Sequence, residues 1–389
     1  MTPALLSVED AQARILDLVT PLPTESCPLA AAHGRWLATP LLARRTQPWA
    51  DLSAMDGYAL TGDGPWQVVR DIPAESRDPG TLAHGEAARI FTGAPLPTGA
   101  DRILIQENAA RDGDHLTATT PASPGQWIRP RANEFHEGAL LADSGSAVTA
   151  GLIGLAASAG HGTLEVRRRP RVTLIATGSE LVVPGDRSEG LPSANSPMLA
   201  AVFAPVADVT DRGIVGDDLA AIRAYIAGSA TADVIVLTGG ASVGDHDLVR
   251  PALEAEGWAI AFHKVAMKPG KPLMIATRGD QIAFGLPGNP VSAYVTALLF
   301  VLPPLRRLTG AAAPLPPQHT AILAAPLAAG GPRTEYLRGA MTADGRVQAI
   351  GSQDSAALSA LARADCLIRR DSNAPPANEG ARVTIHLIA

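Results

Sequence analysis

A short apolar strand that runs directly into a glycine-rich turn constrains the fold of this chain more than any other segment. Residues 233–238 read Asp-Val-Ile-Val-Leu-Thr, and Gly-Gly-Ala-Ser-Val-Gly follows at residues 239–244. An uninterrupted β-branched run without polar alternation is typical of a parallel strand that is covered on both faces. We expect a helix over residues 247–256 after the turn, so the segment predicts one βα unit of an α/β domain.

The surrounding sequence continues this alternation of strands and helices. The expected strands cover residues 171–176, 260–265, 273–276 and 282–286, and the expected helices cover residues 197–207, 219–226 and 291–302. We expect the last helix to stop at Pro303-Pro304. This order predicts a doubly wound, mostly parallel sheet. Loops at residues 239–244, 267–272 and 287–290 should then meet at the carboxyl ends of the strands, where open α/β sheets bind ligands.

All three lysines of the chain lie on or beside one of these loops. Lys264, Lys268 and Lys271 fall within eight residues, although the chain has 32 lysine and arginine residues in total. Lysine carries a compact point charge and arginine a planar fork, so a site that needs an ammonium group would keep its lysines. Glycines at 239–244 would let backbone N–H groups approach an anion at a helix N-terminus. A glycine-rich turn alone is often only a tight connection, and clustered lysines are often only solvated, but together they predict an anion site.

Composition narrows the class of protein. The chain has 389 residues, 46% of them hydrophobic, which suffices for about two to four folded domains. A net charge of −6 argues against nucleic acid or an anionic membrane as the main partner. Cys27 and Cys366 lie far apart, so we expect neither a disulfide framework nor a zinc site. Residues 7–10 read as a helix cap and not as a secretion signal, and we expect a cytoplasmic protein.

The remaining segments predict three further domains around the α/β domain at residues 170–310. Residues 46–130 consist of short alternating runs with turn residues, which is typical of a small inserted β domain. The helical patterns on either side, at residues 1–45 and 131–169, then form one discontinuous linker domain. Residues 311–389 again consist of short strands, so the fold class is α/β plus β.

Six motifs, which follow one another along nearly the whole chain, resemble those of the molybdopterin molybdenumtransferases. This bacterial enzyme family is similar to the E domain of gephyrin. The motifs are Ser-Ala-Met-Asp-Gly-Tyr-Ala (53–59), Thr-Gly-Ala-Pro (92–95), Ala-Thr-Gly-Ser-Glu-Leu (176–181), Gly-Gly-Ala-Ser-Val-Gly (239–244), Lys-Pro-Gly-Lys-Pro (268–272) and Leu-Pro-Gly-Asn-Pro-Val-Ser (286–292). The resemblance implies an elongated four-domain homodimer, in which the discontinuous domain also serves dimerisation and the site lies at the subunit interface.

The resemblance also implies a reaction and its partners. Enzymes of this family take adenylylated molybdopterin and molybdate, hydrolyse the adenylate in a divalent-metal-dependent step that releases AMP, and insert molybdenum into the dithiolene. Mg²⁺ is the expected metal, because carboxylates and phosphate oxygens are its usual ligands. We expect these small molecules as substrates, and transient contacts with the molybdopterin adenylyltransferase and with apo-molybdoenzymes.

Individual residues follow from the matching motif positions. The resemblance assigns Asp217, Asp247 and Glu180 to the metal, and adds Asp56 and Thr92 to the catalytic set. For the tetrahedral molybdate dianion, the candidates are Lys268, Lys271, Pro272, Arg338 and Ser352, since charged hydrogen bonds suit an oxyanion. The other predicted substrate contacts are Ser179, Gly239, Gly240, Ser242, Gly244, Lys264, Pro287, Asn289 and Glu134.

Two segments depart from the family pattern. The usual Phe-Asp-Asn before the first motif is Ala-Asp-Leu at residues 50–52. The usual Gly-Glu-Asp of the helical domain is Ala-Asn-Glu at residues 132–134, where Glu134 keeps an acid on a longer side chain. The departures place more weight on Asp56, whose own motif is intact, than on Glu134.

Two alternatives from other classes of protein stay open. Gly-x-Ser-x-Gly after a strand also fits the nucleophile elbow of an α/β-hydrolase, with Ser242 as the nucleophile. His246 and His263 follow Ser242 too closely to be the usual distant partner, and labelling of Ser242 by a fluorophosphonate would support this alternative. Gephyrin-like domains can also be non-catalytic scaffolds, but the intact acids and lysines favour an enzyme.

Overall fold

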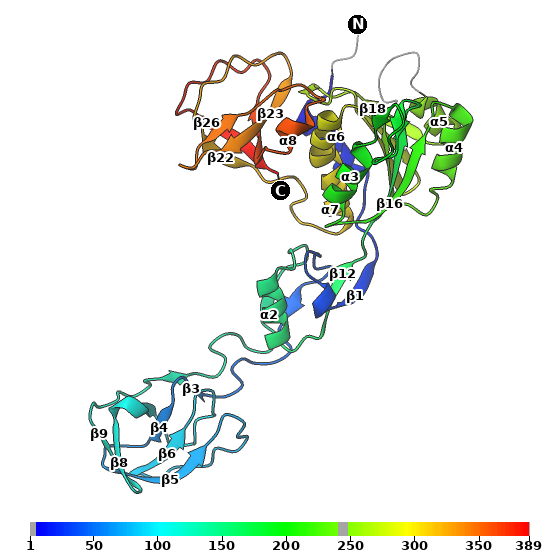
Figure 1. Ribbon diagram of the computed structural model, residues 1–389. Coiled ribbons are helices and arrows are strands. Elements are labelled where there is room, and N and C mark those ends of the chain that lie inside the picture. Colours follow the sequence, from blue (N-terminus) through cyan, green and yellow to red (C-terminus); the bar gives the residue numbers. More distant parts are fainter. Residues whose placement is uncertain (1–4, 240–247, 389) are drawn as a thin grey trace.

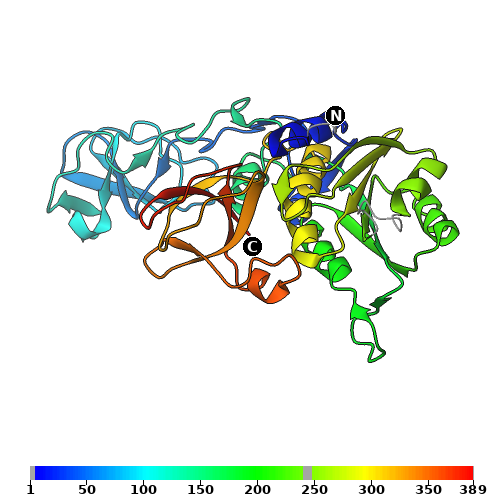
Figure 2. The same ribbon diagram turned by 90° about the horizontal axis from the view of Figure 1, so that it is seen from above.

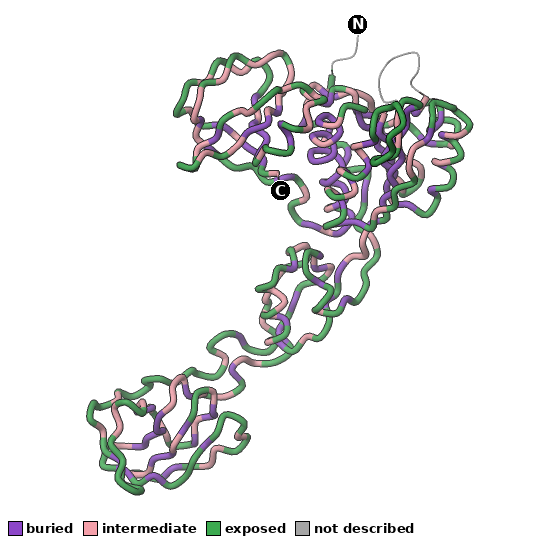
Figure 3. The backbone as a smooth tube through the Cα atoms, in the orientation of Figure 1, coloured by how far each residue is buried: buried purple, intermediate pink, exposed green. Residues whose placement is uncertain are grey.

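The computed structural model describes residues 5–239 and 248–388 and shows an elongated, multidomain molecule (Figure 1). One end holds a central sheet with its helices and, beside it, a C-terminal sheet. A slim middle part leads to a third sheet at the far end (Figure 1). Figure 3 shows that buried residues gather inside each part, while the connection between the middle and the far end is mostly exposed. The protein is therefore a mixed α/β chain with several separate cores.

The central sheet has six strands in the order β16-β13-β17-β21-β20-β18 and is covered by helices on both faces. Alternate residues of a strand face opposite sides. Val234 and Val236 of β17 join the core that includes α1, α3 and α6, whereas Ile235 and Leu237 join the core with α4 and α5. The elements are β13 (Arg171–Thr177), β16 (Asp208–Val215), β17 (Val234–Thr238), β18 (Ala259–His263), β20 (Met274–Arg278), β21 (Gln281–Leu286), α1 (Val8–Asp17), α3 (Asn195–Phe203), α4 (Leu219–Ala227), α5 (Val249–Ala255) and α6 (Pro290–Thr296).

This sheet is less parallel than the sequence predicts. β13, β16, β17 and β21 are parallel, but β20 runs antiparallel to β21, and β18 runs antiparallel to β20. Only Gly279 and Asp280 separate the paired residues Arg278 and Gln281, and such a short turn allows a hairpin but no crossover. The first residue of β20 therefore lies beside the last residues of β21, so the lysine loop still reaches the carboxyl edge of the parallel strands.

The helix after β21 is longer than the sequence predicts. α6, the π-helical η3 (Ala297–Val301) and α7 (Leu302–Leu308) follow one another without a break, so the expected end at Pro303-Pro304 is wrong. Both prolines lie in the first turn of α7 and follow the π-helical stretch. Each proline removes one N–H donor from this continuous helix, a loss that burial of the turn in the protein core offsets.

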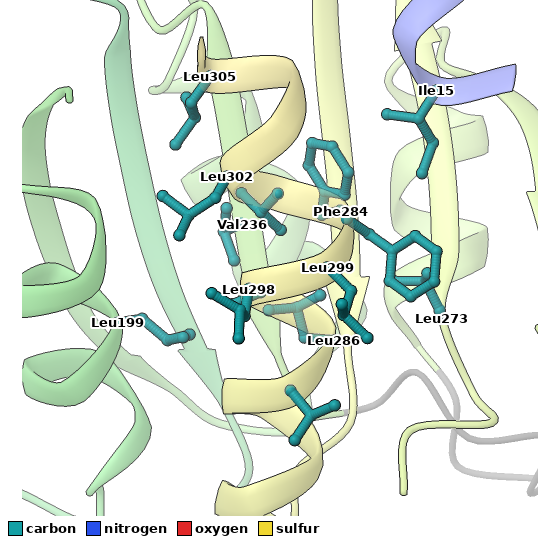
Figure 4. Close-up of a cluster of buried hydrophobic side chains, with 14 of the residues drawn as sticks. Ile15, Leu199, Val236, Leu273, Phe284, Leu286, Leu298, Leu299, Leu302 and Leu305 are labelled. Carbon is teal, nitrogen blue, oxygen red and sulfur yellow. The ribbon is translucent and has the colours of Figure 1, made fainter. Parts of the chain in front are cut away.

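This long helix forms the centre of the largest core. Among the described residues, only the helix Pro290–Leu308 is long and apolar enough to span a membrane, yet 83% of its apolar stretch is buried inside the protein. It is therefore the core helix of a folded domain. Figure 4 shows its side chains beside those of the sheet and of α1, including Leu298, Leu299, Leu302 and Leu305 from the helix, Val236, Phe284 and Leu286 from the sheet, and Ile15 from α1.

The N-terminal segments form α1 and the middle part. α1 begins as expected, since Ser7 Oγ accepts a hydrogen bond from the Asp10 N–H at 3.0 Å. In the middle part, strands that are far apart in the sequence pair antiparallel, β1 with β12 and β2 with β11. The elements are β1 (Thr24–Pro28), η1 (Leu29–Ala31), β2 (Leu41–Leu42), β11 (Leu140–Ala142), α2 (Ala150–Ser158) and β12 (Thr163–Arg167).

The far end consists of one six-stranded sheet in the order β7-β4-β6-β5-β9-β8, with the short pair β3 and β10 next to it in the chain. Its strands are β4 (Gly57–Leu60), β5 (Trp66–Ile72), β6 (Glu86–Ile90), β7 (Arg102–Ile105), β8 (Ala109–Asp112) and β9 (His115–Ala118), with η2 (Gln106–Asn108), β3 (Leu52–Ser53) and β10 (Ile128–Arg129). This all-β part lies between the two halves of the middle part in the sequence.

The C-terminal sheet takes one strand from the lysine loop. Its order is β19-β23-β25-β26-β22, and β24 pairs with β23. β19 runs parallel to β23, with Lys268 opposite Glu335, so the lysine loop is held between the central domain and the C-terminal sheet. The elements are β19 (Met267–Lys268), β22 (His319–Ile322), β23 (Thr334–Met341), β24 (Val347–Ala349), α8 (Leu358–Leu361), β25 (Cys366–Arg370) and β26 (Arg382–Leu387).

Candidate functional site

A cavity of about 1190 Å³ opens at the carboxyl edge of the parallel strands. The central domain supplies the residues that follow β13, β16, β17 and β21, together with the lysine loop. The short ribbon of β14 (Leu181–Val182) and β15 (Leu191–Pro192) forms another wall and projects in green from the central domain in Figure 2. The C-terminal part closes the cavity with Arg333, residues 353–356 and Leu358. The cavity therefore lies between two domains.

Two carboxylates border the cavity near the ends of β13 and β16. Glu180 and Asp217 both line it. The Ser179 N–H donates to Asp217 Oδ2 at 2.9 Å, and the Asp217 N–H donates to Ser179 Oγ at 2.9 Å, so the two loops hold each other. The Glu180 carboxylate lies against Gly178, where an added Cβ would come within 2.6 Å of Oε2. Ser179 thus fixes the Asp217 backbone and carboxylate without lining the cavity itself.

The third expected metal ligand, Asp247, lies outside the described residues. Within residues 5–239 and 248–388, no group of three acidic, histidine or cysteine side chains is close enough to hold a metal ion. Glu180 and Asp217 nevertheless fit Mg²⁺, which proteins often bind through one or two carboxylates while phosphate oxygens and water fill the other positions.

The glycine-rich turn begins at Gly239, which lines the cavity. Gly239 has φ +94°, and an added Cβ would lie 2.2 Å from the backbone oxygen of Thr177, so only glycine fits between β17 and β13. Gly240, Ser242 and Gly244 lie outside the described residues. From the neighbouring loop, Pro287 and Asn289, two of the expected substrate contacts, line the cavity.

The lysine loop brings two of the three lysines to the cavity. Lys268, Lys271 and Pro272 line it. Lys268 Nζ also makes an ion pair with Glu335 Oε1 at 3.1 Å. Lys264, with φ +78°, follows the end of β18 and is not among the residues that line the cavity.

Arg338 and Ser352 occupy a different place from the one the sequence predicts. The Arg338 side chain is buried, and its Nη2 donates to the backbone oxygens of Ser352 at 2.6 Å and Asp354 at 2.9 Å. Burial lowers the pKa of this guanidinium, and Asp354 opposes that effect. Neither Arg338 nor Ser352 lines the cavity, whereas Arg333 and Ser355 do. Arg338 therefore supports the loop that forms the cavity wall from behind.

The support from Arg338 leads to a testable stability prediction. We expect Arg338→Met to leave the backbone oxygens of Ser352 and Asp354 without this buried donor and to destabilise the loop at residues 351–356 by about 2 kcal/mol. Amide hydrogen exchange of this loop should then accelerate by roughly 30-fold. Arg346→Met is the matched control, because Arg346 is a partly exposed arginine in the turn between β23 and β24 whose ion pairs with Asp344 and Glu379 contribute little. Unchanged protection in Arg338→Met would contradict the supporting role.

Sequence reasoning missed two polar residues at the start of α3. Ser193 and Asn195 line the cavity. Asn195 Nδ2 donates to the Gly288 carbonyl at 2.8 Å, but Asn195 Oδ1 and Ser193 Oγ are buried without a hydrogen-bond partner in the described structure. Arg333 and Ser355 were missed as well. Their sequence carries no spacing signal, because only the docking of the C-terminal sheet brings them to this edge.

Three predicted residues lie away from this cavity. Thr92 donates to Asp56 Oδ1 from its N–H at 2.7 Å and from its hydroxyl at 2.8 Å. These bonds, together with nearby Arg89, hold the pKa of Asp56 below its ordinary value, so the carboxylate is charged at neutral pH. Asp56 directly precedes β4 and Thr92 follows β6 by two residues, so the pair lies beside the sheet at the far end of the molecule (Figure 1). Glu134 lies on the connection to that sheet, where its N–H donates to Gln47 O.

Comparisons with known proteins cover nearly the whole chain. Three family models match: "MoeA N-terminal region (domain I and II)" at residues 6–160, "Probable molybdopterin binding domain" at residues 173–307, and "MoeA C-terminal region (domain IV)" at residues 320–388. Molybdopterin molybdenumtransferase 2 of Mycobacterium tuberculosis is 34% identical over 93% of this chain and 94% of its own length. The molybdopterin molybdenumtransferase of a Nostoc strain is 37% identical over 79% of this chain and 75% of its own length.

Solved structures agree with the fold. Two structures of the molybdopterin biosynthesis protein MoeA from Pyrococcus horikoshii align with TM-scores of 0.82 and 0.85, each over 99% of this chain and at least 99% of their own, at 26% and 24% identity. The fold and the matched regions place the chain among proteins that carry a molybdopterin-binding domain and act in molybdenum cofactor biosynthesis. Within this class, the chain belongs to the molybdopterin molybdenumtransferase family, which favours this enzyme activity over the hydrolase and scaffold alternatives.

Proposed function

We propose that this chain hydrolyses adenylylated molybdopterin, releases AMP and transfers molybdenum from molybdate to the molybdopterin dithiolene within the cavity between the central domain and the C-terminal sheet. One observation carries the proposal. Among the described residues that line the cavity, the carboxylates Glu180 and Asp217 lie on the central-domain side, and the cations are Lys268, Lys271 and Arg333; a third carboxylate, Asp354, belongs to the C-terminal wall. A metal-bound phosphoanhydride needs the first set, and an oxyanion needs the second. Incubation with adenylylated molybdopterin, Mg²⁺ and molybdate, followed by assays for AMP and molybdenum cofactor, tests it directly.

The carboxylate side would handle the adenylate. Asp217 and Glu180, together with Asp247, are the proposed ligands of Mg²⁺, which supplies charge neutralisation of the phosphate groups when it is bound. Ser179 would keep the Asp217 carboxylate in place through the two hydrogen bonds described above. Gly239 lets the backbone approach the phosphates, and Gly240, Ser242 and Gly244 remain proposed contacts there.

The cationic side would bind molybdate. Lys271 and Lys268 supply point charges, Arg333 supplies a planar fork, and Ser355 supplies a hydroxyl group, all from residues that line the cavity. Asn289 Nδ2 donates to Ser355 Oγ at 2.8 Å, which orients that hydroxyl. We therefore propose Arg333 and Ser355 as direct contacts and give Arg338 and Ser352 the supporting role behind the wall.

The far-end residues would act in the second subunit of a homodimer. Asp56 and Thr92 form a charged, hydrogen-bonded pair at the opposite end of the molecule from the cavity. A two-fold dimer could bring this pair of one subunit to the cavity of the other, and Glu134 with it. We further propose the domain division 1–45 with 131–169, 46–130, 170–310 and 311–389, a cytoplasmic location, and transient contacts with the adenylyltransferase and apo-molybdoenzymes.

Lys271→Ala tests the oxyanion side on its own. Because loss of one charged hydrogen bond costs about 1.5–3 kcal/mol, we expect half-saturating molybdate to rise roughly ten- to a hundredfold. AMP release without molybdate should change much less, since the carboxylates are intact. Lys264→Ala serves as the control, because Lys264 does not line the cavity. A titration of molybdate against cofactor formation measures both variants, and equal half-saturation in Lys271→Ala and the unmodified chain would remove Lys271 from the oxyanion site.

A further inference from the structure

Lys268 has an acidic partner where the C-terminal sheet meets the lysine loop. β19 pairs parallel with β23, and this register places Lys268 directly opposite Glu335. Their side chains meet at 3.1 Å between Nζ and Oε1, with the Lys268 side chain 55% exposed and the Glu335 side chain only 14% exposed. The pairing of two strands fixes the acid, so the contact is built into the backbone and does not depend on a chance meeting of two mobile side chains.

Within the part of the chain that the structure describes, the other two cations of the cavity have no such partner. Among the described residues, no acid lies within ion-pair distance of Lys271 or Arg333, although both line the cavity with Lys268. Arg333 Nη1 instead donates to the backbone oxygen of Met267 at 3.2 Å, next to Lys268. Glu335 is therefore the one described acid that forms an ion pair with any of these three cations, on the side where the C-terminal sheet contacts the loop.

We propose that Glu335 is an affinity-determining residue, a fixed counter-ion that weakens oxyanion binding by competing for Lys268. The inference rests on the proposed function, since it concerns the same oxyanion site. Glu335 does not line the cavity and so acts through Lys268, which makes it a positioning residue. Its carboxylate occupies one of the three N–H donors of the ammonium group and cancels one of the three positive charges at this end of the cavity.

Weaker binding of the oxyanion is an advantage for a transferase. Three unopposed cations would hold a tetrahedral dianion tightly before the reaction, and tight binding of the starting material lowers the half-saturating concentration without accelerating transfer. The molybdenum must leave this site for the dithiolene, so its oxyanion site should not retain it. The same three cations would also attract sulfate and phosphate, which carry similar charge and shape. Glu335 reduces the charge that all these anions share.

Glu335→Gln tests this inference because it keeps the shape and removes the charge. We expect molybdate, measured by equilibrium dialysis with the full chain, to bind roughly 3- to 30-fold more tightly, as expected when a unit charge a few ångströms away is removed in a partly solvated site. Sulfate should compete more strongly by a similar factor, and the maximal rate of cofactor formation should not rise. Glu335→Asp, which keeps the charge, should stay closer to the unmodified chain.

Two controls make the outcome decisive. Glu379→Gln removes the same charge from the same sheet, where Glu379 pairs with Arg346 at 2.8 Å, and should leave molybdate binding unchanged. In a Lys268→Met chain, Glu335→Gln should have a clearly smaller effect, because competition for the ammonium group is gone and only the through-space charge effect remains. Weaker or unchanged molybdate binding in Glu335→Gln, or an effect of the same size without Lys268, would overturn the inference. Absence of molybdate binding in the unmodified chain would instead overturn the proposed function on which it rests.

Discussion

Asp217→Asn is expected to reduce AMP release from adenylylated molybdopterin by on the order of a thousandfold while the fold stays intact. Asp217 lines the cavity beside Glu180, and its replacement removes a charged oxygen from the proposed Mg²⁺ site, which is worth several kcal/mol of charge stabilisation in the transition state. The amide of Asn can still accept the hydrogen bond from the Ser179 N–H, so the loop geometry should be kept. A quenched assay of AMP at saturating substrate and Mg²⁺ measures the effect.

The neighbouring residue supplies the control. Asp218 caps α4 by accepting a hydrogen bond from the Ala221 N–H at 2.7 Å, and it does not line the cavity. Asn is as good an N-cap as Asp, so Asp218→Asn makes the same chemical change one residue away and should leave both stability and AMP release nearly unchanged. Full AMP release by Asp217→Asn, or an equal loss in Asp218→Asn, would contradict the assignment of Asp217.

The central domain could be predicted largely because its strands are fully buried. The run at residues 233–238 has no polar alternation, and it forms β17 in the middle of the sheet. The direction of β20 and β18 could not be read in the same way, because apolar runs at a sheet edge look alike in either direction. The turn at Gly279-Asp280 was the sequence feature that indicated the direction of β20, since two residues between strands permit only a hairpin.

Proline gave a misleading signal at the end of the long helix. A Pro-Pro pair normally ends an α-helix, but here it follows a π-helical stretch and falls in the first turn of α7. Burial decides the outcome. Pro303, Pro304 and Leu305 are all buried in the largest core, so packing of the continued helix outweighs the local preference to stop.

In the candidate site as well, the sequence indicated the residues that come from one sheet and missed those that the docking of a second sheet supplies. Glu180, Asp217, Gly239, Lys271 and Asn289 come from loops after strands of one sheet, and the topology of α/β sheets requires such loops to meet at one edge. Arg333 and Ser355 come from another sheet, and only its docking brings them to the cavity. The sequence indicated Arg338 instead, which is buried within β23, five residues after Arg333.

The position of Asp56 leads to the last prediction, which concerns assembly. Asp56→Asn and Asp217→Asn chains should each be inactive alone, and an equal mixture after subunit exchange should recover about a quarter of the activity of the unmodified protein. The reason is symmetry: random exchange makes about half of the dimers mixed, and each mixed dimer then has one cavity with both acids intact.

A second pair of variants separates this explanation from a general rescue by mixing. Asp217 and Glu180 line the same cavity of one chain. In a mixed dimer of Asp217→Asn with Glu180→Gln, every cavity therefore keeps one defective acid, and no activity should return. Mass spectrometry of isotopically labelled chains can prove exchange in both mixtures. Recovery in the second mixture, or no recovery in the first despite proven exchange, would mean that Asp56 does not complete the cavity of a partner subunit, because only a site shared between two chains distinguishes the two pairs.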